Sequence, residues 1–308
     1  MSQRRLYPLF NAKELQQKVK CTVMLQEYMT KHTSWHIGGP ADLMLSPHDI
    51  EDLSQALKYA QENNLPVTVI GNGTNLLVGD KGIRGLVIKI GRGLSDISIF
   101  KEMIFTEAGT PLAQLLKYAK SSELAGFEFL TGMPGTVGGA LIMNAGANNN
   151  SIGDRVKKVF ACDYSGTKLV FDASELTFAY RYSCLAQKKI IVTGVQLSGI
   201  PGRLEDIEAR TQNYLSRRQK NQPQNYPNAG SVFKNPTGDS AGRLIELAGC
   251  KGQQIGNIQV STKHANFFVN LGGGTAIDVL KLIQKVQQKV MDKHGVQLVL
   301  EIEKLGEF

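Results

Sequence analysis

The stretch PVTVIGNGTNLL, residues 66–77, joins a compact β-branched run to a turn rich in glycine. The run predicts a strand over 66–70. Gly71 and Gly73 begin like a GxGxxG fingerprint, but the third glycine is absent and no helical pattern follows. The stretch therefore excludes a Rossmann domain. It leaves either an ordinary strand-connecting turn, or a turn whose backbone amides can approach a diphosphate, with the Thr74 and Asn75 side chains as further donors.

Outward from this turn, strands and helices alternate in a β/α order. Ser46 as N-cap and Pro47 as first helical residue predict a helix over 46–64, and Thr110-Pro111 predicts the start of a second one. Further expected elements of the N-terminal two thirds are strands at 86–90, 103–109 and 188–198, a helix at 111–126, and two strands around a turn at Ser165-Gly166.

The turn sequence Gly199-Ile-Pro-Gly202 separates the strand patterns before it from a charged helical pattern after it, and predicts the main domain boundary. Beyond it we expect a charged helix to about 219, a strand at 230–234, a helix at 239–248 and strands within 258–270. Apolar residues at helical spacing predict a long helix that Gly295 ends, before a closing strand. The first twenty-five residues suggest only a helix.

The composition predicts a soluble protein of two or three domains. The chain has 308 residues, of which 42% are hydrophobic, without an apolar run long enough to span a bilayer. The four cysteines are far apart without a CxxC pair, and the N-terminus lacks a secretory pattern, so we expect free thiols in the cytoplasm. Lys and Arg are scattered, which favours phosphorylated small molecules over nucleic acid as the reason for the net charge of +8.

A second glycine-rich segment, GMPGTVGGALIMNAGA, spans residues 132–147. Glycine in a plain helix costs about 1 kcal/mol relative to alanine, so this density suggests close approach of a ligand. Two such loops in one half of the chain suggest a long ligand with central phosphates, as in a flavin or nicotinamide dinucleotide. His32 and His36 stand four apart but lack an acidic third ligand, so we expect no metal site.

The ordered set of motifs resembles the UDP-N-acetylenolpyruvoylglucosamine reductase family, flavoenzymes of bacterial cell-wall synthesis. The resemblance covers the chain from about residue 33 to its end, in the compact variant that lacks an extra substrate loop. The motifs that carry it are TSWHIGGPA (33–41), GNGTNLL (71–77), GMPGTVGGA (132–140), MNAG (143–146), YRYS (180–183), NAGSVFKNP (228–236), AGRLIE (241–246), VSTKHANF (260–267) and LEIE (300–303).

The resemblance implies an α+β fold with a two-lobed FAD-binding domain of the vanillyl-alcohol-oxidase / p-cresol methylhydroxylase type and a C-terminal α+β substrate domain. The implied boundaries are 1–90 for the first lobe, 91–200 for the second and 201–308 for the substrate domain. FAD is expected to lie along both glycine loops, with binding residues Gly71, Asn72, Gly73, Thr74, Asn75, Leu76, Pro134, Gly135, Gly138, Gly139, Ala140, Asn144 and Gly146.

The family's reaction implies roles for three residues outside the loops. In the family, NADPH reduces the flavin, which passes a hydride to the enolpyruvyl group of a UDP-sugar. By motif match Ser231 donates the proton, while Arg181 and Glu303 flank the substrate carboxylate. Without the resemblance, each would be read as an idle surface residue. Substrate-binding residues implied more weakly are Tyr180, Lys234, Asn235 and His264.

Two other functions compete with this one. An FAD oxidoreductase of the same fold with a different substrate would not need the Ser231, Arg181 and Glu303 set. A catalytically idle nucleotide- or RNA-binding protein would explain the positive charge, but the chain shows no interleaved aromatics and no RNA-binding module. We therefore expect a UDP-sugar as partner and no nucleic acid, membrane or metal.

Overall fold

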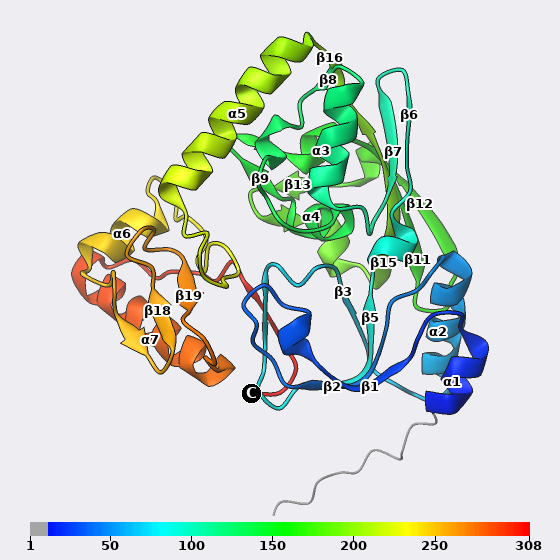
Figure 1. Ribbon diagram of the computed structural model, residues 1–308, viewed down its shortest axis with the longest axis horizontal. Helices are drawn as coiled ribbons and strands as arrows, with labels where there is room; N and C mark the ends of the chain where they lie inside the picture. The colour runs from blue at the N-terminus through cyan, green and yellow to red at the C-terminus, as the bar shows by residue number, and fades with distance from the viewer. Residues whose placement is uncertain (1–11) are drawn as a thin grey trace, which may run out of the picture.

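The computed structural model describes residues 12–308, which form two lobes and a C-terminal domain (Figure 1). The first lobe is built on a four-stranded sheet in which β2, β5 and β3 run parallel and β1 is antiparallel to β2. Two helices pack their apolar side chains on one face of this sheet. The elements are α1 (Ala12–Lys18), β1 (Met24–Tyr28), β2 (Pro40–Leu45), α2 (Ile50–Glu62), β3 (Val67–Ile70), β4 (Leu76–Val78) and β5 (Ile83–Lys89).

The second lobe contains a five-stranded antiparallel sheet in the order β12-β11-β15-β7-β6. Its main elements are β6 (Ile97–Phe100), β7 (Met103–Glu107), α3 (Leu112–Ser121), α4 (Val137–Met143), β11 (Val156–Asp163), β12 (Lys168–Asp172) and β15 (Ile190–Ser198). Short pairs flank the sheet: β8 (Leu124–Ala125) with β16 (Ile200–Pro201), β9 (Gly146–Ala147) with β10 (Asn150–Ser151), and β13 (Phe178–Ala179) with β14 (Tyr182–Ser183).

The C-terminal domain is a small three-stranded sheet with helices on it (Figure 1). Its elements are α5 (Leu204–Asn221), α6 (Ala241–Leu247), β17 (Gln254–Ile255), β18 (Ile258–Val260), β19 (Phe268–Asn270), α7 (Ala276–His294) and β20 (Glu303–Leu305). Within residues 12–308, no helix combines the length and apolar character that crossing a bilayer requires.

Two of the hydrophobic cores tie the units together. One core contains buried residues from both lobes, such as Leu53 of α2 and Leu115 of α3. A second joins Trp35 and Leu77 of the first lobe to the C-terminal domain. Trp35 is fully buried, and its indole N–H donates to the Phe268 carbonyl at 2.9 Å. The first lobe is therefore packed against both other units.

Two segments after residue 200 pack outside the small C-terminal sheet. Helix α5 lies against α3 of the second lobe, with an ion pair between Arg210 and Glu128 at 2.8 Å. Strand β20 returns to the first lobe and pairs in parallel with β4. The domain boundaries near 90 and 200 stay predictions, but these contacts mean that the expected units interlock.

Most expected strands and helices lie where the sequence placed them, with four corrections. Helix α2 begins at Ile50 with Asp49 as its N-cap, not at Ser46-Pro47. Helix α3 spans Leu112–Ser121, with Pro111 as its N-cap, and so ends before the expected stop at Gly126. The expected strand at 230–234 is reduced to isolated bridges at Ser231 and Phe233, and the closing strand to β20. Of the N-terminal helix only α1 lies among the described residues.

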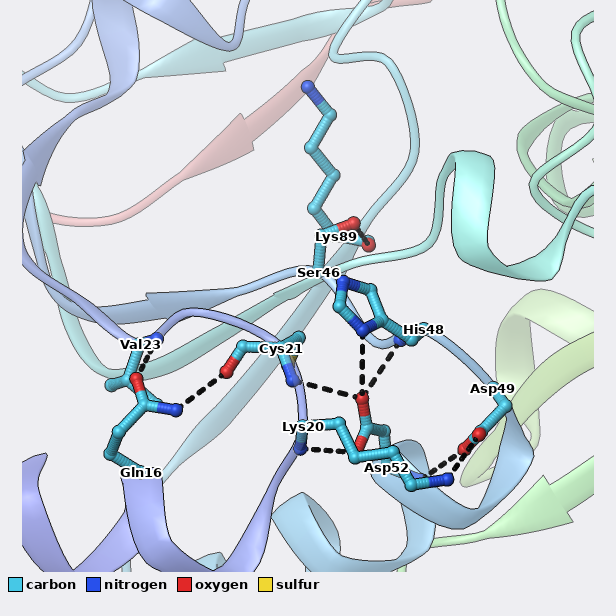
Figure 2. Close-up of polar contacts among 9 residues, drawn as sticks. All are labelled: Gln16, Lys20, Cys21, Val23, Ser46, His48, Asp49, Asp52 and Lys89. Carbon is cyan, nitrogen blue, oxygen red and sulfur yellow. Dashed lines mark hydrogen bonds and ion pairs between the residues drawn. The ribbon is translucent and has the colours of Figure 1, made fainter.

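The start of α2 is fixed by a buried carboxylate, shown in Figure 2. Asp52 is 2% exposed and accepts hydrogen bonds from the backbone N–H groups of Lys20, Cys21 and His48 at 2.7, 3.2 and 3.0 Å. Asp49 caps the same helix by accepting from the Asp52 N–H. The Asp52 carboxylate thus holds two segments against the first turn of α2: residues 46–49, which follow β2, and residues 20–21, which follow α1. Burial raises the pKa of the nearby Cys21 thiol to about 11, which disfavours the reactive thiolate at neutral pH.

We expect Asp52→Ala to lower the free energy of unfolding by roughly 2–4 kcal/mol, because buried N–H groups lose their acceptor. Chemical denaturation followed by circular dichroism measures this loss. Lys20→Met is the matched control, since Lys20 pairs with Asp49 from an exposed position and such a pair contributes about 0–1 kcal/mol. Equal stability of both variants would contradict the structural role of Asp52.

Candidate active site

The first glycine loop leaves the carboxyl end of β3 and leads into β4, which begins at Leu76. Gly73 has a φ of 64°, and a Cβ on it would lie 2.0 Å from the His32 carbonyl oxygen. A Cβ on Gly71 would lie 2.5 Å from the Thr136 hydroxyl oxygen. Among the described residues, no backbone N–H of residues 72–75, which include Asn72, finds an acceptor. The loop thus presents a row of unpaired donors, as an anion site requires.

The second glycine loop lies directly against the first. The Thr74 hydroxyl donates to the Pro134 carbonyl at 3.4 Å, and a Cβ on Gly135 would lie 3.2 Å from the same hydroxyl. Gly138, the second residue of α4, lies against Ala108: its N–H donates to the Ala108 carbonyl at 2.7 Å, and a Cβ on it would lie only 2.9 Å from the Ala108 Cβ. The expectation that the two loops form one site is therefore supported by their contacts.

Helix α4 and its exit hold the remaining predicted cofactor residues. Thr136 caps the helix by accepting from the Gly139 N–H, and Ala140 is buried in the shared core. Asn144 ends the helix in the left-handed region, and its buried amide donates to the Ala179 carbonyl at 2.7 Å. Gly146 follows in β9, where a Cβ would clash with the Asn150 carbonyl. Ala140 and Asn144 therefore have structural roles.

The donor-rich loops fit the diphosphate of a dinucleotide cofactor. Backbone amides without acceptors supply hydrogen bonds to phosphate oxygens, and glycine permits the close approach. Asn75 links this loop to the C-terminal segment. Its side-chain amide donates to the Glu301 backbone carbonyl at 3.0 Å, and its backbone carbonyl accepts from the Glu303 N–H. The first loop therefore lies next to the end of the C-terminal domain.

The tight β13–β14 hairpin presents Tyr180 and Arg181 to the same region. Arg181 has a φ of 50°, which is rare for a residue with a side chain and stores strain that the surroundings must hold. Its guanidinium stacks over the Tyr180 ring at 5.2 Å and donates from Nη1 to the Gly146 carbonyl at 3.1 Å. The strained turn fixes the direction of the positive charge.

The carboxylate that meets Arg181 is Glu301, not Glu303. Arg181 Nε donates to Glu301 Oε1 at 2.5 Å, whereas Glu303 is exposed on β20 and pairs with Leu76. Burial raises the pKa of Glu301, and the Arg181 charge opposes that shift. The expected role of Glu303 beside the substrate carboxylate stays a prediction, but Glu303 does not contact Arg181, because the chain passes from the C-terminal domain to the first lobe between the two glutamates.

Ser231 lies on a backbone segment held from both sides. Its isolated bridge is to Phe267, and the next carbonyl, that of Val232, accepts from the Glu301 N–H at 2.8 Å. The buried Asn266 side chain accepts from the Phe233 N–H and donates to the Phe233 carbonyl. Ser231 is thus close in the backbone to Glu301, and none of the hydrogen bonds formed among residues 12–308 uses its hydroxyl.

Three of the four predicted substrate-binding residues, Tyr180, Lys234 and Asn235, join this network and His264 does not. Lys234 Nζ donates to the Arg181 carbonyl at 3.4 Å, and the Asn235 N–H donates to the Tyr180 hydroxyl at 3.2 Å. His264 instead packs edge-on against Phe267, accepts from a backbone N–H, and has its pKa lowered by burial. These contacts give His264 a packing role, while the other residues connect the second lobe to the C-terminal domain.

The chain matches known families over most of its length. Residues 41–172 match the FAD binding domain, and residues 222–305 match the UDP-N-acetylenolpyruvoylglucosamine reductase C-terminal domain. The UDP-N-acetylenolpyruvoylglucosamine reductase of Desulforamulus reducens is 48% identical over 96% of this chain and 98% of its own, and that of Moorella thermoacetica 45% over 96% and 97%. The chain belongs to the UDP-N-acetylenolpyruvoylglucosamine reductase family.

The family membership agrees with the fold. The crystal structure of UDP-N-acetylenolpyruvylglucosamine reductase from Thermus caldophilus superposes with a TM-score of 0.80 at 35% identity, covering 93% of this chain and 99% of that one. The expected fold class, a two-lobed FAD-binding domain with a C-terminal substrate domain, is confirmed. This member of the family is therefore an FAD-containing oxidoreductase.

Sequence reasoning about this reductase missed two residues at the site. Glu301 stands in the same LEIE motif as Glu303, and only the contact with Arg181 distinguishes them. Asn266 stands in VSTKHANF, where nothing in the sequence signals that a side-chain amide will clamp the backbone beside Ser231.

Proposed function

We propose that the protein reduces UDP-N-acetylglucosamine enolpyruvate to UDP-N-acetylmuramate with NADPH, in the synthesis of peptidoglycan precursors. FAD, held along residues 71–76 and 134–146, would supply the hydride chemistry between NADPH and the terminal carbon of the enolpyruvyl group. The observation that carries the proposal is the ion pair between Arg181 and Glu301 at 2.5 Å, next to the segment that holds Ser231. This arrangement combines a positive charge and a proton source in a family of known reductases.

Arg181 stabilises the charge that develops on the substrate carboxylate and its adjacent carbon. The guanidinium has five N–H donors, of which Nε donates to Glu301 and Nη1 donates to Gly146. The donors that remain can bind a carboxylate, and their fixed direction avoids reorganisation in the transition state. Glu301 orients this fork, and we assign to Glu301, rather than to Glu303, the carboxylate that partners Arg181.

Ser231 donates the proton to the carbon next to the carboxylate. A serine hydroxyl is a weak acid in water. The enolate that accepts its proton, however, is a far stronger base than the groups that act as bases at neutral pH. The hydroxyl needs only a fixed position in a site from which water is excluded. The clamp of Asn266 on the Phe233 backbone supplies that rigidity.

The UDP-sugar lies between the lobes and the C-terminal domain in this proposal. Lys234 offers an ammonium for the diphosphate, and Asn235 and Tyr180 offer polar contacts to the sugar nucleotide. NADPH uses the same cleft before the substrate enters. We place the reaction in the bacterial cytoplasm, whose reducing conditions fit the four free thiols at Cys21, Cys162, Cys184 and Cys250.

The proposal predicts that the purified protein is yellow, and that adding UDP-N-acetylglucosamine enolpyruvate accelerates NADPH oxidation by at least about tenfold. Visible absorbance spectra and stopped-flow absorbance at the NADPH band measure both effects. A yellow protein without this acceleration would favour the alternative, an FAD oxidoreductase of the same fold with a different substrate. A colourless protein that takes up no FAD would refute both.

A further inference from the structure

A lysine without a counter-ion lies at the carboxyl end of β5, beside the first glycine loop. Lys89 is half-buried, and no carboxylate in the described part of the chain pairs with it. Its ammonium contacts His32 Nδ1 at 3.3 Å, and burial lowers its pKa. A half-buried ammonium that faces only a ring nitrogen is poorly compensated for its lost hydration.

The contacts of His32 determine which group donates and which accepts in the hydrogen bonds that link Lys89, His32 and Glu27. An ammonium can only donate, so His32 Nδ1 accepts from Lys89. The other ring nitrogen, Nε2, then carries the proton and donates to Glu27 Oε1 at 3.0 Å. The hydrogen bond from His32 holds the pKa of Glu27 below its usual value. Glu27 therefore orients a neutral imidazole, which in turn orients the ammonium of Lys89.

The position of Lys89 directs this ammonium toward the cofactor loops. Lys89 is the register partner of Ile70, the last residue of β3 before the loop. The carbonyl of His32 packs directly against Gly73 in that loop. Figure 2 shows the Lys89 side chain extending away from α2 and from the Asp52 cluster. Ligands of open sheets with parallel strands bind at this carboxyl edge.

We infer that Lys89, oriented by His32 and Glu27, binds the diphosphate of FAD together with the backbone amides of residues 72–75. The loop offers backbone N–H groups without acceptors, and Lys89 offers an ammonium without a carboxylate partner. A phosphate anion compensates both the ammonium and the amides, and a sugar or a ring carbonyl would compensate only the amides. Lys89 would then be a cofactor-binding residue, and His32 and Glu27 positioning residues. The inference rests on the proposed placement of FAD along the glycine loops.

The test measures FAD affinity rather than turnover. The apoprotein is titrated with FAD and with riboflavin by flavin fluorescence, for the wild type and for Lys89→Met, Lys89→Arg and Lys31→Met. We expect Lys89→Met to weaken FAD binding about 10- to 100-fold and to leave riboflavin binding unchanged, because riboflavin has no phosphate. Lys89→Arg should retain most of the affinity. Lys31→Met is the matched control, since this exposed lysine contacts the same Glu27 at 3.3 Å.

A second variant tests the positioning role. His32→Gln should weaken FAD binding less than Lys89→Met does, and the double variant should bind as weakly as Lys89→Met alone, because His32 acts through the lysine. Wild-type apoprotein that fails to bind FAD would overturn the proposed function itself. FAD affinity in Lys89→Met equal to that of the wild type, or an equal loss for riboflavin, would overturn only the inference on Lys89.

Discussion

Ser231→Ala will stop turnover while leaving the reductive half of the reaction intact. We expect NADPH to bleach the bound flavin at the wild-type rate, and the subsequent oxidation by the enolpyruvyl substrate to fall by about 10²- to 10⁴-fold. The reason is that positioned proton transfer contributes this much, and the alanine offers no proton. Rapid-mixing absorbance measurements on each half-reaction separate the two steps.

Ser231→Cys provides the control for this prediction. A thiol also carries a proton and is close in size to a hydroxyl, so part of the lost rate should return. The backbone of the segment should be unaffected in both variants, since Val232 and Phe233 hold it through their own hydrogen bonds. Wild-type turnover by Ser231→Ala would remove this residue from the mechanism.

The second large effect separates two glutamates that lie two residues apart. Glu301→Gln should lower kcat/KM by about 10²-fold or more, because a neutral amide no longer fixes the Arg181 guanidinium that stabilises the transition state. Steady-state kinetics with the UDP-sugar as varied substrate measures this change.

Glu303→Gln is the matched variant for that comparison. Glu303 is exposed and contributes its backbone to the pairing of β20 with β4, so its kcat/KM should stay within about twofold of the wild type. A large loss in Glu303→Gln together with normal activity of Glu301→Gln would restore the assignment made from the motif and contradict the one made from the contact.

Local patterns in the sequence predicted most elements of the fold. The strand before Gly71 and the long helix that ends at Gly295 are examples, because β-branched runs and helical spacing reflect short-range physics. Gly295 ends α7 with a φ of 65°, as expected of glycine after a helix. Element starts were less predictable. The N-cap of α2 is Asp49 and not Ser46, because the Asp52 carboxylate inside the helix accepts from the His48 N–H and holds residues 46–49 outside the helix.

The candidate site divides in the same way. The glycine content of the two loops predicted backbone hydrogen-bond donors there, and the family motifs predicted Arg181 and Ser231 as site residues. Only the structure shows that Thr74 touches Pro134, so that the loops form one cradle. The packing of His264 against Phe267 was likewise invisible, since a histidine in a motif can bind or merely pack.

The sequence by itself determined the family, the order of the elements and the chemistry that the glycine loops can perform. The tertiary structure decided which glutamate faces Arg181. The Glu301 N–H bonds to Val232 in the C-terminal domain, and the Glu303 N–H bonds to Asn75 in the first lobe. The chain thus passes from one unit to another between these two residues, and strand alternation no longer relates their side chains. Such a crossing depends on contacts between segments more than sixty residues apart, which no local pattern encodes.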